Sequence, residues 1–178
     1  MKHGTHFLHF TALFLFTRCS DDTPGLNSQY AEVGHYMDQL VAGTYTDWEL
    51  PDFNPEAIPA LLEYADDSTS VSAFPRNGLS SFYQPEVSLG MLALWTVESI
   101  RVRDLVASTP RGFGRFPSLN PALGLRASPV LELAISYETQ LGAARAYRSW
   151  WDSRILMGGD FEKLRRIDPL AGTAWCWH

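Results

Sequence analysis

Residues 89–106 constrain the fold more than any other part of the chain. Residues 89–97 are apolar on almost every side of a helix, and a helix of this kind has to lie inside the protein. A helix over the whole segment would be roughly 27 Å long. The charged residues of its second half exclude a membrane span; they are Glu98, Arg101, Arg103 and Asp104. We therefore expect this helix to form the buried centre of a globular domain.

Further helices are predicted from hydrophobic spacing and from helix-end signals. Apolar residues recur three and four positions apart over residues 27–41, and Gly43 follows as a stop signal. Residues 54–56 are typical of a helix start, with a capping Asn, a Pro in the first position and an acid in the first turn. A long helical pattern covers residues 128–157 and stops at Gly158.

The remaining stretches are predicted to be loops rather than strands. Residues 72–85 and 109–125 are rich in turn-forming residues. The best strand candidates, residues 71–74 and 82–83, are short and show no convincing alternation of apolar and polar side chains. We therefore expect an all-α fold, a compact array of about four to six antiparallel helices with long loops, in one helical domain over residues 29–178.

The C-terminal tail contains Trp175 and Trp177. Chain ends fray unless they are tied down, and two exposed indole rings would leave a sticky surface. We therefore predict that at least one of these rings packs against the helical core. Cys176, which lies between them, is expected to be buried.

The N-terminal residues are typical of an export signal. Residues 7–16 are mostly apolar, but they are too few to span a bilayer, and Cys19 follows closely. A Cys at this place resembles the lipobox of bacterial lipoproteins, although Arg18 stands where a lipobox has a small residue. Residues 20–22, Ser-Asp-Asp, resemble the acidic tag that directs Bacteroidetes lipoproteins to the outer face of the outer membrane.

These features predict three segments: a signal peptide over residues 1–18, a flexible tether over 19–28, and the folded domain. A lipid anchor at Cys19 would attach the protein to the outer membrane, on its surface, or otherwise leave it in the periplasm. The alternative is a disordered apolar and polar tail over residues 1–28. If Cys19 is not acylated, it can instead form a disulfide bond with Cys176.

Charge and motif content exclude several classes of function. The net charge is −6 at pH 7, which disfavours nucleic acid as a partner. His35 and His178 stand alone, and neither H-E-x-x-H nor C-x-x-C occurs, so no metal site is predicted. Residues 112–114, Gly-Phe-Gly, lack the preceding strand of a dinucleotide-binding loop. No cofactor is expected.

Glu98 is the one candidate for a catalytic carboxylate. It lies on the apolar face predicted for the helix over residues 89–106, where a carboxylate has to be paired or protonated. One interpretation is a general acid or base with a raised pKa. The interpretation that we favour is a structural ion pair with Arg101, one turn away, or with an Arg from a loop.

Two loops contain candidate binding residues. The first offers donors for an anion or a sugar, although Asn and Ser also cap turns, and it lacks the G-x-S-x-G motif of a hydrolase. Its candidates are Arg76, Asn77, Ser80 and Ser81. The second loop combines cationic and aromatic side chains that suit an acidic partner or a glycan, although Arg stems also cover apolar surface. Its residues are Arg111, Phe113, Arg115, Phe116 and Arg126.

Several short strings, spread over most of the chain after the predicted signal, form a recognisable set. They include Gly43-Thr44-Tyr45, Leu50-Pro51-Asp52-Phe53, Phe74-Pro75-Arg76-Asn77, Leu94-Trp95-Thr96-Val97-Glu98, Arg115-Phe116-Pro117-Ser118-Leu119-Asn120-Pro121 and Asp168-Pro169-Leu170. Together they resemble a family of secreted lipoproteins from gut Bacteroidetes that is built on a domain of unknown function. Gly78 departs from the Pro expected there. The resemblance implies an exported envelope protein, and it implies no activity and no site residues.

The sequence therefore predicts an exported cell-envelope lipoprotein of unknown activity. Its membrane contact is the lipid anchor at Cys19, and we expect it to act as a non-catalytic binding or accessory protein for an envelope protein or a glycan. The alternative is a hydrolase-like envelope enzyme that uses Glu98 together with the loop over residues 76–81. The first prediction is favoured because so few residues are suited to catalysis.

Overall fold

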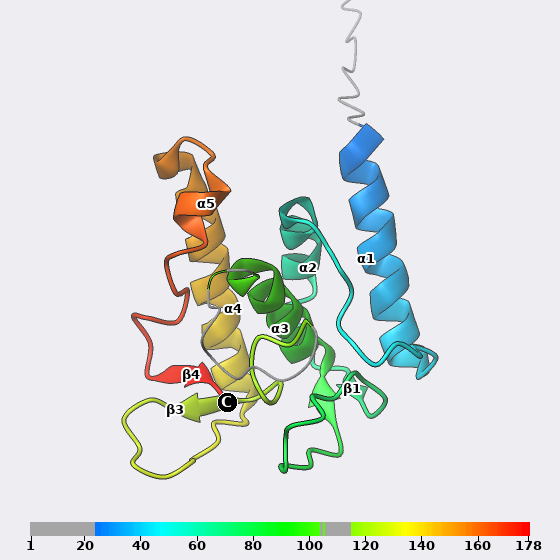
Figure 1. The fold of residues 1–178 in the computed structure, drawn as a ribbon, viewed down its shortest axis with the longest axis vertical. Helices are drawn as coiled ribbons and strands as arrows, with labels where there is room; N and C mark the ends of the chain where they lie inside the picture. Colours follow the sequence, from blue (N-terminus) through cyan, green and yellow to red (C-terminus); the bar gives the residue numbers. More distant parts are fainter. Residues whose placement is uncertain (1–23, 104, 106–114) are drawn as a thin grey trace, which may run out of the picture.

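The computed structural model describes residues 24–103, 105 and 115–178 of the chain (Figure 1). Within these residues, helices of different lengths alternate with short strands. In chain order the elements are α1 (Pro24–Ala42), η1 (Pro55–Ala57), α2 (Ile58–Glu63), β1 (Ser70–Val71), β2 (Val87–Ser88), α3 (Leu89–Val102), β3 (Leu123–Leu125), α4 (Tyr137–Asp152), η2 (Ser153–Met157), α5 (Phe161–Leu164) and β4 (Trp175–Trp177).

Helix α3 is the centre of the domain, as its apolar sequence predicts. It packs against α1, α2 and α4, and Met91 is its only residue that is not buried. Trp95 is fully buried, and its indole Nε1 donates a hydrogen bond to Ser118 Oγ over 2.7 Å. The helix ends at Val102, four residues earlier than predicted, where Arg103 leaves the helical conformation and its guanidinium bonds to residues of the loop between α1 and η1.

The prediction of an all-α fold is wrong. Two small antiparallel sheets accompany the helices, so the domain is mixed helix and strand. In one sheet Val71 of β1 pairs with Val87 of β2, and in the other Leu123 of β3 pairs with Trp177 of β4. These strands are two or three residues long, which is too short for the alternation that identifies a strand in a sequence.

The prediction of one long helix over residues 128–157 is also wrong at its beginning. Helix α4 starts nine residues later, where the Ser136 side chain accepts a hydrogen bond from the backbone of Thr139. Before that point the chain runs along β3, with hydrogen bonds from Leu125 N to Glu132 O and from Ala134 N to Leu123 O. The apolar residues of this loop match a helical spacing by chance, because their backbone bonds are made to β3.

The predicted helix ends at Gly43 and Gly158 are confirmed. Both glycines have a φ of 67°, a left-handed conformation that favours Gly and ends a helix. In α1 the buried residues follow the predicted spacing of three and four positions; they are Val33, Tyr36, Met37 and Leu40.

The predicted packing of the C-terminal tail is confirmed as well. As part of β4, Trp177 donates its indole N–H to the Tyr147 hydroxyl over 2.7 Å, and the ring of Trp175 packs onto Gly142 of α4. A Cβ at position 142 would lie 2.5 Å from that ring, so a Gly at this position leaves room for Trp175. Cys176 is only half-buried, contrary to the prediction, because alternate side chains of a strand point to opposite faces.

We predict that Trp177→Ala lowers the free energy of unfolding by about 2–4 kcal/mol, because it removes a packed indole and its bond to Tyr147. Trp48→Ala is the matched control: Trp48 is 62 % exposed, and its loss should change stability by less than about 1 kcal/mol. Urea unfolding of both variants makes the comparison. If Trp177→Ala is as stable as the wild type, β4 does not hold the fold together.

Candidate functional site

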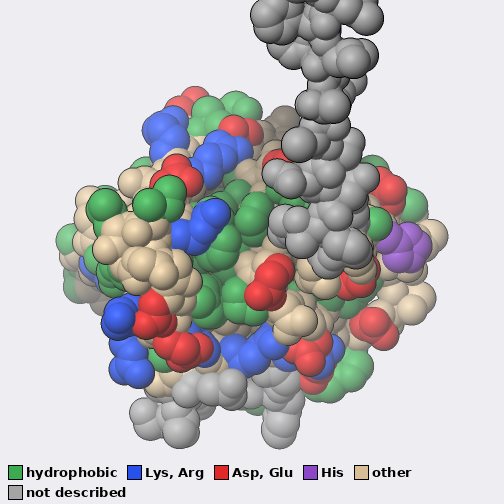
Figure 2. Space-filling view, turned by 90° about the horizontal axis from the view of Figure 1, so that it is seen from above, with side chains coloured by type: hydrophobic (Ala, Val, Ile, Leu, Met, Phe, Trp, Pro, Cys, Tyr) green, Lys and Arg blue, Asp and Glu red, His purple; other side chains and the backbone are tan. Residues whose placement is uncertain are grey.

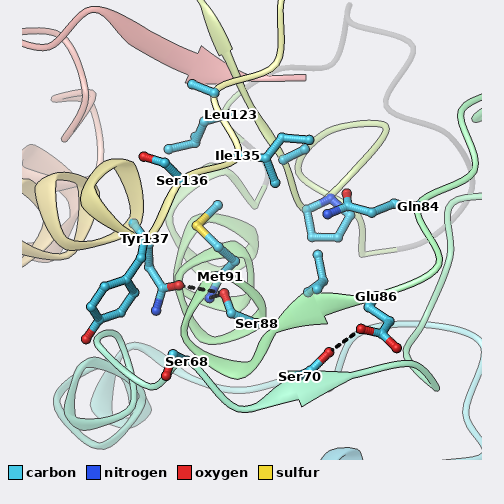
Figure 3. A pocket seen from close by; sticks show the side chains of 15 residues that line it. Ser68, Ser70, Gln84, Glu86, Ser88, Met91, Leu123, Ile135, Ser136 and Tyr137 are labelled. Carbon is cyan, nitrogen blue, oxygen red and sulfur yellow. Dashed lines mark hydrogen bonds between the residues drawn. The ribbon is translucent and has the colours of Figure 1, made fainter.

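A cleft of about 310 Å³ lies where the N-terminal ends of α3 and α4 meet the two small sheets (Figure 3). Its polar lining consists of hydroxyl and carboxamide side chains and one carboxylate; these residues are Ser68, Ser70, Gln84, Glu86, Ser88, Ser136, Tyr137 and Gln140. Its apolar lining consists of Val87, Met91, Pro121, Ala122, Leu123, Ala134 and Ile135. No Lys, Arg or His is found among the described residues that line the cleft.

The floor of the cleft is held by a chain of hydrogen bonds between α3 and α4. Ser88 caps α3 by accepting from the backbone of Met91, and its hydroxyl donates to Gln140 Oε1 over 2.6 Å. The Gln140 carboxamide in turn donates to the carbonyl groups of Ala65 and Asp67. Gly90 allows Gln140 and the Ala65 carbonyl to lie close to α3, because a Cβ at position 90 would clash with both.

Gln84 is the unusual polar residue of the cleft. Only 7 % of it is exposed, yet within the described part of the chain its side-chain Oε1 has no hydrogen-bond partner. In Figure 3 Gln84 and Tyr137 lie on opposite sides of the cleft, with Met91 between them. At the rim, Glu86 accepts a hydrogen bond from Ser70 Oγ over 2.7 Å. Gln84 therefore holds an acceptor without a partner, and this acceptor is enclosed in the wall of the cleft.

A smaller hollow of about 130 Å³, here called the side pocket, adjoins the cleft. Gln84 and Pro121 line both spaces. The side pocket gathers all four candidate residues of the first predicted binding loop; these are Arg76, Asn77, Ser80 and Ser81. The structure therefore brings these four predicted residues together.

Hydrogen bonds and ring contacts hold the loop of the side pocket in place. The Arg76 guanidinium lies 4.1 Å from the ring centre of Phe74 and 4.9 Å from that of Tyr83, and its Nη1 donates to the Gln84 carbonyl. Ser80 Oγ donates to Asn120 Oδ1 over 2.7 Å. The loop is thus fixed on the segment that leads into β3.

Glu98 lies in the interior, in neither the cleft nor the side pocket. It is 5 % exposed and accepts three hydrogen bonds, two from Arg101 at 2.6 and 2.7 Å and one from the Tyr147 hydroxyl at 2.7 Å. The ion pair with Arg101 that the sequence suggested is present. The structure does not bring Glu98 together with the loop over residues 76–81 in one pocket.

The protonation states around Glu98 favour a fixed ion pair. Burial, and then the charge of Glu98, raise the pKa of Tyr147 well above its usual value, so the phenol keeps its proton and donates a hydrogen bond to Glu98. Burial lowers the pKa of Arg101, but its hydrogen bond to Glu98 and the Glu98 charge outweigh this effect and raise the pKa above its usual value. Proton transfer by these partners near neutral pH is therefore unfavourable.

The other predicted site residues do not join the cleft. Arg115 forms an ion pair with Glu49 at 3.1 Å and bonds to the Leu50 carbonyl. Arg111 and Cys19 lie outside the described residues. In the described ranges no cluster of three or more His, Cys, Asp or Glu side chains is suited to hold a metal ion. No helix in those ranges has the length and apolar character needed to cross a membrane.

The molecule is thus a small mixed helix-and-strand domain with an open, mostly uncharged cleft. Residues 27–178 match the family model described as a domain of unknown function, DUF4943, and the chain belongs to that family. Comparisons with curated proteins and with solved structures give no match. This match confirms the domain of unknown function that the sequence resemblance included. Secretion, lipidation and a Bacteroidetes origin remain predictions.

Sequence reasoning missed the main residues of the cleft. Gln84, Glu86 and Gln140 belong to no motif, and only tertiary structure brings them together. The one available signal was Ser88. It directly precedes the helix predicted from residue 89 onward, and this is the usual position of an N-terminal cap.

We predict that Glu98→Ala lowers the free energy of unfolding by about 3–5 kcal/mol, because it leaves Arg101 buried without its counter-charge. Lys163→Ala is the matched control, since Lys163 forms a pair of the same spacing with Asp160 and both side chains are exposed, 71 % and 38 %. Its loss should cost less than about 1 kcal/mol. Denaturant unfolding measures both, and a fully stable Glu98→Ala variant would refute the structural role.

Proposed function

We propose that the protein is an exported, lipid-anchored, non-catalytic binding protein of the cell envelope, and that the cleft is its binding site. The observation that carries this proposal is the position of the cleft relative to Pro24, the first described residue. Helix α1 begins at the top of Figure 1, whereas β1 and β3, which border the cleft, lie at the bottom. A tether that ends at Pro24 would leave the cleft facing away from the anchor.

The surface around the beginning of α1 supports attachment by a lipid. Seen from above, this end of the domain is a mixture of acidic, basic and hydrophobic side chains, with no single charge sign dominating the visible face (Figure 2). Such a surface has little electrostatic attraction for an anionic membrane. An acyl group on Cys19 would supply the attachment instead, and the Ser-Asp-Asp segment after it favours the outer face of the outer membrane.

The chemistry of the described residues supports binding rather than catalysis. Glu98, the candidate acid or base, is occupied by three donors and lines neither hollow. The Ser hydroxyls of the cleft have no His among the described lining residues to activate them as nucleophiles. The cleft itself is of the size and composition of a small ligand site, at the lower end of the usual range of about 300–1,000 Å³.

We predict that cells fed a palmitate analogue label the wild-type protein and do not label Cys19→Ala. Cys176→Ala is the matched control: it removes the only other Cys of the chain and should keep the full label, because lipidation depends on the Cys after the apolar segment. Equal labelling of wild type and Cys19→Ala, or none of either, would contradict the anchor.

Protease added to intact cells tests the predicted position of the anchored protein. Digestion of the wild type, with a periplasmic marker protein left intact, is the expected result for a protein on the cell surface. Protection until the outer membrane is opened would place the domain in the periplasm.

A further inference from the structure

We infer that the cleft and the side pocket form one continuous two-part site for a neutral glycan, and that Gln84 is the residue that recognises it. This inference rests on the proposed binding role of the cleft and names its ligand class. It also gives a function to the loop over residues 76–81, whose side chains line the second part of the site.

The two parts of the site lie side by side, because two residues line both of them. The cleft of about 310 Å³ and the side pocket of about 130 Å³ both contact Gln84 and Pro121. The Gln84 backbone is held by the Arg76 guanidinium, which donates to its carbonyl over 2.7 Å. Arg76 is itself stacked on Phe74 and Tyr83. A ligand longer than one ring would therefore pass the Gln84 side chain on its way from one hollow to the other.

The Gln84 carboxamide points to a ligand with hydrogen-bond donors. A buried acceptor without a partner is unfavourable, and in the described part of the chain Gln84 Oε1 is such an acceptor. The neighbouring polar groups are already engaged, since Ser88 and Gln140 bond to each other and Ser70 bonds to Glu86. A ligand hydroxyl would supply the missing donor to Gln84 once the carboxamide turns toward the cleft, because Oε1 is enclosed in this structure.

The electrostatics of the cleft select against anions. Glu86 is the only charged side chain among the described residues that line it, and no cation balances it there. A phosphate, sulfate or carboxylate group would be repelled, whereas a neutral hydroxyl group can donate to this carboxylate. The ligand is therefore neutral in the part that occupies the cleft.

The apolar surfaces of the site match a sugar ring better than a peptide. Met91 and Leu123 form an apolar floor that suits the C–H faces of a sugar. Each hollow also has an exposed tyrosine in its lining, Tyr137 in the cleft and Tyr83 in the side pocket. A peptide would usually be bound by adding a strand to a sheet edge. The strands at the cleft, β1, β2 and β3, are two or three residues long and offer little edge for that.

The test uses the full chain in detergent, on an array of neutral, uronate-containing and sulfated oligosaccharides and extended peptides. The strongest binder is then titrated against three variants. Gln84→Leu should bind about ten-fold more weakly or worse, because one hydrogen bond to a buried group is lost. Its melting temperature should equal or exceed that of the wild type, because the unpartnered acceptor is gone.

Gln29→Leu is the matched control. Gln29 Oε1 is also buried without a partner in the described residues, but it lies on α1, away from the cleft. This variant should bind like the wild type. Glu86→Gln, at an exposed position on the rim, should weaken neutral-glycan binding several-fold with an unchanged melting temperature, and it keeps the inference testable if Gln84→Leu folds poorly.

Several results would overturn the inference. These are binding of acidic glycans or peptides only, no binding on the array, or wild-type affinity in both Gln84→Leu and Glu86→Gln. None of these results alters the lipid label at Cys19 or the exposure of the domain on cells. A wrong ligand class is therefore distinguishable from a wrong assignment of the protein to the envelope.

Discussion

A single buried carboxylate, Glu98, joins parts of the chain that are far apart in sequence. Its three hydrogen bonds come from Arg101 of the same helix and from Tyr147 of α4, and Tyr147 also accepts from Trp177 of β4. Arg101 extends the network to the carbonyl of Arg165, just after α5. Because a buried charge is tolerated only when its partners are in place, α3, α4, α5 and β4 have to come together as one unit.

The two ends of α3 have different roles. The C-terminal half holds Glu98 and Arg101, which bind the neighbouring elements together. The N-terminal end holds Ser88 and Met91, which form the floor of the cleft, and Gln140 links this end to α4. With the two helices joined by the hydrogen bond from Tyr147 to Glu98, the cleft between their N-terminal ends can keep an unsatisfied polar group without collapsing around it.

Sequence alone predicted what depends on neighbours in the chain and missed what depends on distant partners. The central helix, the glycine helix ends and the ion pair of Glu98 with Arg101 follow from local spacing, and all are present. The four strands are too short to carry a pattern, and the start of α4 was missed because apolar loop residues beside β3 imitate a helix. The cleft was not predictable, because only the tertiary structure brings Gln84 and Gln140 to the same space. The residues of the loop at 76–81 were found from the sequence, but the position of their side pocket next to the cleft was not.

The central claim is that the cleft binds while the network around Glu98 only supports it. Protein-observed NMR during a titration with neutral oligosaccharides tests this claim most directly. The account predicts that the side-chain amide signals of Gln84 and the backbone signals of Ser88 and Met91 shift on binding, while the indole signal of Trp177 stays in place. Shifts at Trp177 with an unmoved Gln84 would contradict it, because the ligand would then act on the supporting network instead of the cleft.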